Sequence, residues 1–269
     1  MIRFPQTKRS RALGVAFVTL LASAAGVLPS AAAEVKAAVA ANFTEAAKEI
    51  GRLFEKATGD KAVFSFGATG LLYTQITQEA PFEVFLSADQ KTPKKAIADG
   101  LAVPDSLFTY ATGKVVLFSK NKDLVKGETT LEEGNFEKIA IANPQTAPYG
   151  AAGVEVMKKL GVYDALAPKI VRGNNIAQAY QFVETGNAEV GFVALSQVVN
   201  EDDGSRWIVP ANLYATIAQD AVLLKMGEGN PVAHAFLTFL KGPEARTVTE
   251  KYGYGVGAAV AAKAPAPAQ

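Results

Sequence analysis

Cysteine is absent from the 269-residue chain, and histidine occurs once, at His234. A chain without cysteine forms no disulfide and no thiolate metal site. A single imidazole also argues against zinc, copper and haem centres, which are generally built from clustered histidine or cysteine ligands. The composition therefore excludes a disulfide-stabilised fold and disfavours a metalloenzyme.

The chain also lacks a large excess of charge of either sign, because 27 basic residues face 26 acidic ones, for a formal net charge of +1. Residues 1–33 hold four of the basic residues and no acidic one. The remaining 236 residues therefore carry 23 basic and 26 acidic side chains, a net charge of −3 with the histidine neutral. A mildly acidic chain has no electrostatic footprint for nucleic acid or acidic lipid, so we expect neither as a partner.

Residues 1–33 have the three parts of a secretory signal peptide. Four basic residues lie near the start, an apolar run extends over Leu13–Leu21, and the small residues Ala31-Ala32-Ala33 end the segment. The polar stretch that begins at Glu34 argues against a retained membrane anchor, and the absence of cysteine argues against lipidation. The sequence thus predicts Sec-type export and cleavage, with the mature protein in the periplasm.

Beyond residue 33, short apolar or β-branched runs alternate with segments of helical periodicity. This alternation predicts the α/β class, with mixed and mostly parallel sheets flanked by helices. The first helix shows its pattern most clearly, because apolar residues from Phe43 to Ala57 recur on one face and Gly59 then ends the helix. The runs predicted as strands are Val35–Val39, Ala62–Phe66, Glu83–Leu86, Val115–Phe118, Ile139–Ala142 and Val190–Val193.

The chain is predicted to cross twice between two α/β units. It leaves the first unit near Tyr110–Lys114, and the strand-like run Ala221–Leu224 returns to it. Two crossings make a hinge between two lobes. We expect residues 34–112 and 218–256 to form the first lobe, residues 113–217 to form the second, and residues 257–269 to be a disordered tail.

Four places join a strand or loop to a helix through small, polar or amide-rich residues. In open α/β sheets, ligands bind outside the carboxyl ends of the strands, where helix N-termini present unpaired N–H groups and a partial positive charge. An anion can bind there without a cationic side chain. The four junctions are Ala40–Thr44, Gly67–Gly70, Pro148–Ala151 and Asn174–Ala177.

Two of these junctions offer side-chain donors. Asn42 has amide hydrogens for a ligand oxygen, but Glu45 three residues later fits a capping box, so helix capping is the competing interpretation. Thr69 either caps its helix or donates its hydroxyl to a ligand. Its neighbours Gly67 and Gly70 would let the backbone approach that ligand closely. Asn42 and Thr69 are therefore candidate ligand residues.

The other two junctions offer backbone donors. Tyr149 lies at a helix start and can donate its N–H, whereas its ring would only line or cover the pocket. Ile176 can contribute only a backbone N–H to an anion, and in isolation it would be a core residue. We expect no catalytic site, because Ser87 lacks the G-x-S-x-G motif and no carboxylate stands in a catalytic pattern with a histidine or a second carboxylate.

Several short motifs occur in a characteristic order and spacing. They are Ala40–Thr44, Ser65–Gly70, Phe85–Gln90, Asn143-Pro144, Pro148–Gly150, Gly191–Val193, Leu240–Pro243 and Tyr252-Gly253. Together they resemble the periplasmic molybdate-binding proteins of ABC importers, over essentially the whole chain after residue 33. The resemblance implies a two-lobed, type II-like periplasmic binding protein with its ligand in the interlobe cleft. It also implies an inner-membrane ABC permease as partner, a monomer, no cofactor and no enzymatic activity.

The resemblance further implies a ligand set of neutral donors, with no direct bond between protein and metal. Asn42 and Thr69 stand where members of the family have ligand serines or an asparagine. Tyr149 and Ile176 match positions that donate backbone N–H groups. Ala194 departs from the pattern, because well-known members have a ligand tyrosine there. That hydroxyl is then either absent or supplied elsewhere, and Asn42 and the ring of Tyr149 are the candidates to compensate for it.

The chemistry of the donors bears on the choice of ligand. Molybdate and tungstate are doubly charged and carry no proton at neutral pH, so a site made only of donors suits them. A selective phosphate site would need a carboxylate acceptor, which none of the four junctions contains. Sulfate has the same charge and shape but is smaller, so cavity size must separate it from molybdate. The alternatives are sulfate, phosphate, ferric iron or an organic anion as ligand, an enzyme on the same scaffold, or a structural secreted protein.

Overall fold

A computed structural model describes residues 1–2 and 33–256 of the chain. The expected signal peptide, apart from its ends, and the expected tail at 257–269 lie outside the described residues. Residues 33–256 belong to one compact unit, which contains two five-stranded sheets. Within the described residues, no helix combines the length and apolarity that a membrane crossing requires.

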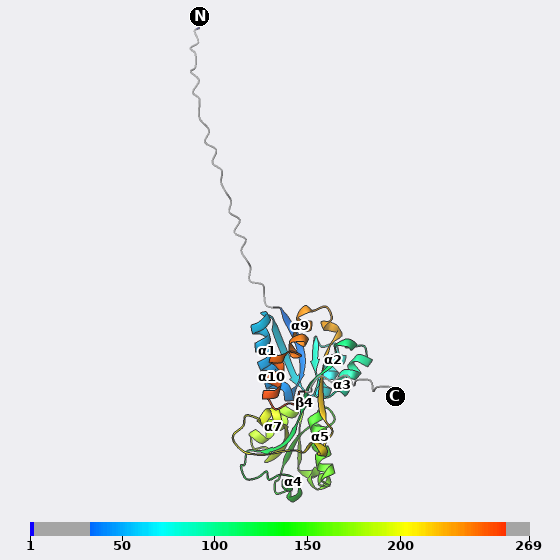
Figure 1. Ribbon diagram of the computed structural model, residues 1–269, viewed down its shortest axis with the longest axis vertical. Helices are drawn as coiled ribbons and strands as arrows, with labels where there is room; N and C mark the ends of the chain where they lie inside the picture. Colours follow the sequence, from blue (N-terminus) through cyan, green and yellow to red (C-terminus); the bar gives the residue numbers. More distant parts are fainter. Residues whose placement is uncertain (3–32, 257–269) are drawn as a thin grey trace, which may run out of the picture. The chain divides into compact units, whose positions relative to one another are not determined.

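The first sheet has the strand order β2-β1-β3-β10-β4. Only β10 pairs antiparallel with both of its neighbours, so the other four strands run in one direction. Its strands are β1 (Glu34–Ala40), β2 (Lys61–Gly67), β3 (Val84–Leu86), β4 (Phe108–Gly113) and β10 (Ile217–Leu223). The helices around it are α1 (Thr44–Thr58), α2 (Thr69–Thr77), α3 (Lys91–Ala98), α9 (Pro231–Leu240) and α10 (Pro243–Lys251), with the 3-10 turns η1 (Ala41–Phe43), η2 (Pro104–Ser106) and η5 (Lys225–Gly227) (Figure 1).

The second sheet repeats this plan in the order β7-β6-β8-β5-β9, and here β5 is the strand that runs against the others. Its strands are β5 (Val115–Ser119), β6 (Ile139–Ala142), β7 (Ile170–Gly173), β8 (Val190–Ala194) and β9 (Ser205–Ile208). The accompanying helices are α4 (Thr129–Glu133), α5 (Pro148–Lys159), α6 (Tyr163–Leu166), α7 (Ile176–Glu184) and α8 (Leu195–Val198), with η3 (Ala167–Lys169) and η4 (Ala211–Leu213).

The chain passes between the sheets twice. Lys114 alone separates β4 from β5, and residues 209–216 lead from β9 back to β10. The predicted α/β class and two-lobed architecture are therefore confirmed. The lobe boundaries at 112/113 and 217/218 stay a prediction.

The core explains why the buried part of β1, residues 37–40, consists of small and β-branched residues. Successive side chains of β1 point to opposite faces of the sheet, so Val35, Ala37 and Val39 pack on the side of α1 and α9, whereas Ala38 packs on the side of α2 and α3. A strand covered on both faces needs apolar residues at every position, which gives a continuous apolar run rather than an alternating one. The first helix ends as predicted, because Gly59 adopts φ 81° after α1.

Candidate functional site

A small cavity lies where the four junctions meet, between the two lobes. It measures about 200 Å³ including open solvent. All four candidate residues line it, although they come from four separate parts of the sequence. The lining residues are Ala40, Ala41, Asn42, Gly67, Ala68, Thr69, Ala88, Ala147, Pro148, Tyr149 and Ile176. The structure thus brings together the four candidate ligand residues.

Helix N-termini from both lobes point at this cavity. Thr69 is the first residue of α2, Tyr149 the second of α5 and Ile176 the first of α7. Within residues 33–256, the N–H groups of these three residues donate no hydrogen bond, as expected for the first turn of a helix. Each helix also adds a partial positive charge of about half a unit at its N-terminus. The cavity therefore attracts anions through neutral groups.

Thr69 is placed to donate through its side chain as well. Its hydroxyl oxygen accepts the N–H of Ala88 at 3.0 Å, so the hydroxyl hydrogen stays available for a second partner. Thr69 is 1% exposed, which shields such a bond from water. The alternative that Thr69 caps its helix is wrong, because Ala68 is the N-cap and makes no side-chain cap.

Asn42 requires a correction. It lies inside η1 rather than at an N-cap, and α1 begins at Thr44 without a side-chain cap, so the capping box with Glu45 is wrong. Its side-chain Nδ2 donates to Gln219 Oε1 at 2.8 Å and to the hydroxyl of Tyr254 at 3.0 Å. Both amide hydrogens are therefore engaged within the protein. Asn42 therefore borders the cavity at the start of η1, where its backbone rather than its side chain is available to a ligand.

A buried hydrogen-bond network lies behind Asn42. Gln219 in β10 accepts from the Tyr110 hydroxyl at 3.1 Å and donates to the Tyr149 hydroxyl at 3.3 Å. The Tyr254 hydroxyl donates to the carbonyl oxygen of Asn42 at 2.6 Å. Burial raises the pKa of Tyr110, Tyr149 and Tyr254 above the ordinary tyrosine value, so these hydroxyls stay neutral.

The sequence did not reveal this network. Gln219 and Tyr254 lie 177 and 212 residues from Asn42, and local periodicity carries no information about such partners. The one available signal was composition, because Gln219 and Asp220 are polar residues inside an otherwise apolar strand. A buried polar side chain in a sheet needs hydrogen-bond partners, which could have marked Gln219 as part of a network.

Ala194 lies at the end of β8 and is fully buried. Its N–H donates to Gln197 Oε1 at 2.9 Å, and it is not among the residues that line the cavity. The two side chains proposed to compensate for the missing tyrosine both reach Gln219 instead, Asn42 through its amide and Tyr149 through its hydroxyl. The Thr69 hydroxyl is therefore the side-chain donor that the cavity retains.

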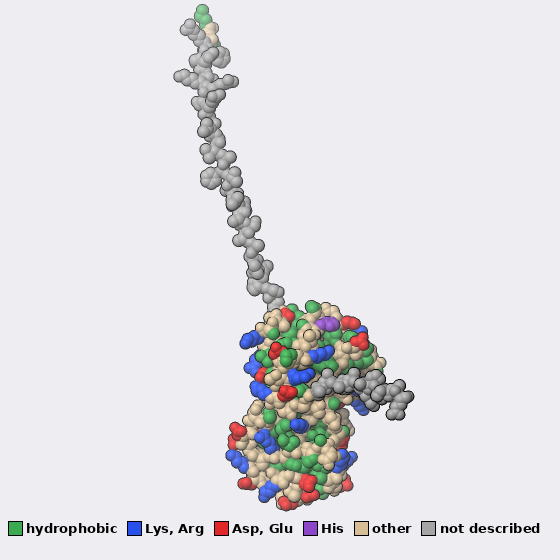
Figure 2. Space-filling view, in the orientation of Figure 1, with side chains coloured by type: hydrophobic (Ala, Val, Ile, Leu, Met, Phe, Trp, Pro, Cys, Tyr) green, Lys and Arg blue, Asp and Glu red, His purple; other side chains and the backbone are tan. Residues whose placement is uncertain are grey.

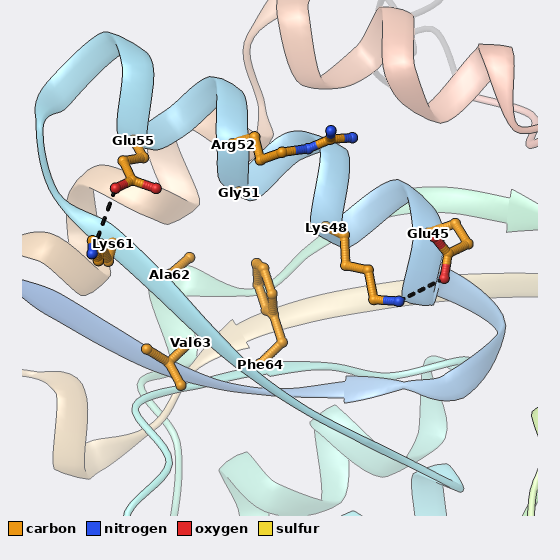
Figure 3. Close-up of a pocket in the computed structure, with 9 residues that line it drawn as sticks. All are labelled: Glu45, Lys48, Gly51, Arg52, Glu55, Lys61, Ala62, Val63 and Phe64. Atoms are coloured by element: carbon orange, nitrogen blue, oxygen red, sulfur yellow. Dashed lines mark hydrogen bonds and ion pairs between the residues drawn. The ribbon is translucent and has the colours of Figure 1, made fainter.

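A second, larger hollow lies on the outer face of the first lobe, between α1 and β2 (Figure 3). It measures about 1010 Å³ including open solvent, and both basic and acidic side chains line it. Two of its cations are paired: Lys48 lies 2.8 Å from Glu45, and Lys61 lies 3.7 Å from Glu55. The hollow belongs to one lobe and contains no helix N-terminus aimed into it, so we do not take it as the ligand site.

Charge elsewhere on the protein does not suggest a metal centre or a single-sign patch. On the face shown in Figure 2, basic and acidic side chains are interspersed over both lobes. In the described part of the chain, no group of three or more His, Asp or Glu side chains is arranged to hold a metal ion. His234 lies in α9, where its Nε2 is 2.9 Å from the carbonyl oxygen of Glu228.

Comparison with known proteins identifies the family. The family model for bacterial extracellular solute-binding proteins matches residues 35–255. The chain is 56% identical over 253 residues to the molybdate-binding protein ModA of Rhodobacter capsulatus, covering 94% of this chain and 98% of that protein. It is 52% identical over 240 residues to ModA of Azotobacter vinelandii, covering 87% and 95%.

A solved structure gives the same result. The periplasmic molybdate-binding protein of Azotobacter vinelandii matches with a TM-score of 0.81 at 40% sequence identity, covering 83% of this chain and 100% of that one. The family resemblance inferred from the sequence motifs is therefore confirmed. The chain belongs to the bacterial extracellular solute-binding proteins, within the ModA family, and is an extracytoplasmic binding protein rather than an enzyme.

Proposed function

We propose that the chain captures molybdate in the interlobe cavity and delivers it to an ABC importer. The observation that carries the proposal is the donor-only lining of the cavity. Among the described residues that line it there is no carboxylate and no cation, whereas free N–H groups and the Thr69 hydroxyl face it. The two relatives named above as molybdate-binding proteins support the same ligand.

The proposed ligand residues are Thr69 through its hydroxyl and N–H, Tyr149 and Ile176 through N–H groups, and Asn42 through the helix start at η1. A hydrogen bond to a charged group contributes about 1.5–3 kcal/mol net, so a handful can outweigh dehydration of the anion. No bond between the protein and the metal atom is needed. Tungstate has the same charge and shape as molybdate, and we propose that it binds as well.

The same reasoning disfavours phosphate. A protonated phosphate must donate its hydrogen, and a buried donor without an acceptor costs about 1–3 kcal/mol. The lining offers backbone and side-chain donors but no carboxylate to accept that hydrogen. Sulfate carries no proton, so only its smaller size distinguishes it from molybdate. Sulfate is therefore harder for the cavity to reject than phosphate.

We also propose the cellular setting. Residues 1–33 act as a Sec-type signal peptide, and the mature protein is a periplasmic monomer that docks on an inner-membrane permease. The support is the composition of residues 1–33 and the extracytoplasmic family to which the chain belongs. No cofactor is required, because the oxyanion is cargo.

Calorimetric titration of the purified protein with molybdate, tungstate, sulfate and phosphate tests the proposal. We expect saturable binding of molybdate and tungstate with one ligand per chain, and binding at least about a hundredfold weaker for sulfate and phosphate, which corresponds to roughly 2.7 kcal/mol. Tight binding of sulfate alone would refute molybdate as the ligand. Absence of heat with all four anions would refute the oxyanion site.

A further inference from the structure

The two lobes touch directly beside the cavity. The N–H of Gly70 in α2 donates to the carbonyl oxygen of Thr146 at 2.9 Å. Gly70 follows Thr69, which lines the cavity from the first lobe, and Thr146 precedes Ala147, which lines it from the second. This hydrogen bond therefore joins the backbones of the two opposing cavity walls.

Gly70 has no space for a side chain at this contact. A Cβ atom there would lie 3.1 Å from Cα of Thr146, and 3.3 Å from both Cβ and the carbonyl oxygen of Thr146. Two of these three atoms belong to the backbone and cannot rotate away. A methyl group at position 70 would therefore have to displace its neighbour by a few tenths of an ångström.

Local hydrogen bonds hold the chain in place on each side of the contact between Gly70 and Thr146. In the second lobe, the carbonyl oxygen of Asn143 accepts the N–H groups of Thr146 at 3.2 Å and Ala147 at 2.9 Å. In the first lobe, the Thr69 hydroxyl is held by the N–H of Ala88. Because both walls are braced locally, the displacement would become a separation of the lobes.

We propose that Gly70 is a positioning residue that sets the separation of the lobes and thereby the size of the ligand cavity. Donors to the anion come from both walls, Thr69 on one side and Tyr149 and Ile176 on the other, and hydrogen bonds weaken steeply with distance. Lobes held slightly too far apart would keep the bonds of one wall and lose those of the other. The ligand identity used in the test rests on the proposed function.

The test compares Gly70→Ala and Gly70→Val with Gly229→Ala in the purified protein. Gly229 also lies in the first lobe, but a Cβ there would meet nothing within 4 Å. Calorimetry should show molybdate affinity about tenfold weaker in Gly70→Ala and weaker still in Gly70→Val, whereas Gly229→Ala should stay within about twofold of wild type.

Two further measurements distinguish a changed separation of the lobes from damage to the fold. Alanine and valine have higher helix propensity than glycine, so the unfolding temperature of unliganded Gly70→Ala and Gly70→Val should be unchanged or raised. The hydrogen bond between Gly70 and Thr146 belongs to the arrangement in which both walls reach the anion, so we expect stopped-flow kinetics to place the loss in faster dissociation with unchanged association.

Unchanged affinity in both variants, a loss carried by association, or a lowered unfolding temperature of the unliganded variants would overturn the inference. The wild-type titration is run beside the variants. A wild-type protein that binds no oxyanion overturns the proposed function, whereas a wild type that binds molybdate beside variants that bind it equally well overturns only the role of Gly70.

Discussion

An anion is expected to bind beside charged residues, yet charged residues line the outer hollow of the first lobe and not the interlobe cavity. The hollow is the larger, at about 1010 Å³ against about 200 Å³ when both include open solvent. It has five charged residues among its nine lining residues, whereas the cavity has none. In the hollow, cations are solvated and face carboxylates (Figure 3). In the cavity, neutral donors are buried, where a low dielectric strengthens each hydrogen bond. The proposed anion site is therefore chosen by the burial and orientation of its donors rather than by formal charge.

Replacing the side-chain donor of the cavity should have the largest effect. In Thr69→Ala the anion loses one charge-assisted hydrogen bond, so molybdate binding should weaken by about 1.5–3 kcal/mol, roughly ten- to a hundredfold, in calorimetry. Thr69→Ser keeps the hydroxyl and should stay within about threefold of wild type. Equal losses in both variants would mean that the methyl group, rather than the hydroxyl, matters at this position.

Removing the Asn42 side chain should act mainly on stability. Asn42→Ala leaves the buried Gln219 and Tyr254 without one partner each, so the free energy of unfolding should fall by about 1–3 kcal/mol in chemical denaturation. Affinity should fall less than in Thr69→Ala, because the amide hydrogens are engaged within the protein.

The exposed Asn187 gives the matched control for that variant, since its amide bonds only to the nearby Thr185 hydroxyl. Asn187→Ala should change the free energy of unfolding by less than about 0.5 kcal/mol. An Asn42→Ala protein as stable as wild type but unable to bind molybdate would show that the amide serves the ligand instead of the network.

Within each lobe, the convergence of two helix starts could be predicted from the sequence, because parallel strands end at the same edge of a sheet and each helix begins there. The meeting of the two edges across the cleft was implied by the resemblance to the family. Thr69 could be proposed from its neighbouring glycines, whereas Tyr149 and Ile176 were proposed as backbone donors mainly through the resemblance to the family. The roles of Asn42 and Ala194 were harder to predict, since they depend on Gln219 and Gln197 and on which atoms face the cavity. Local patterns give the position of a residue on its element but not the partner of its side chain.

The strands that the sequence did not predict were missed for a related reason. These strands are β4, at one edge of the first sheet, and β7 and β9, at the two edges of the second. All three are partly exposed, so their residues need not be uniformly apolar. Arg206 in β9 is an example. An edge strand is specified by the neighbour with which it pairs, and β9 pairs with β5, about 90 residues earlier in the chain. Strands buried on both faces, such as β6, were predicted because burial alone fixes their composition.

Neutralising a cation of the outer hollow should have the smallest effect on molybdate affinity. Arg52 lies ten residues beyond Asn42 on the continuous helical segment, about 15 Å along its axis at 1.5 Å per residue. At roughly 0.1 M salt the Debye length is about 10 Å, so Arg52→Gln should leave molybdate affinity within about twofold of wild type in calorimetry. The change should remain small because the guanidinium is solvent-exposed and lies near the carboxylate of Glu49. A tenfold loss in Arg52→Gln, with the unfolding temperature unchanged, would show that surface cations contribute to anion capture and that the donor-only account of the cavity is incomplete.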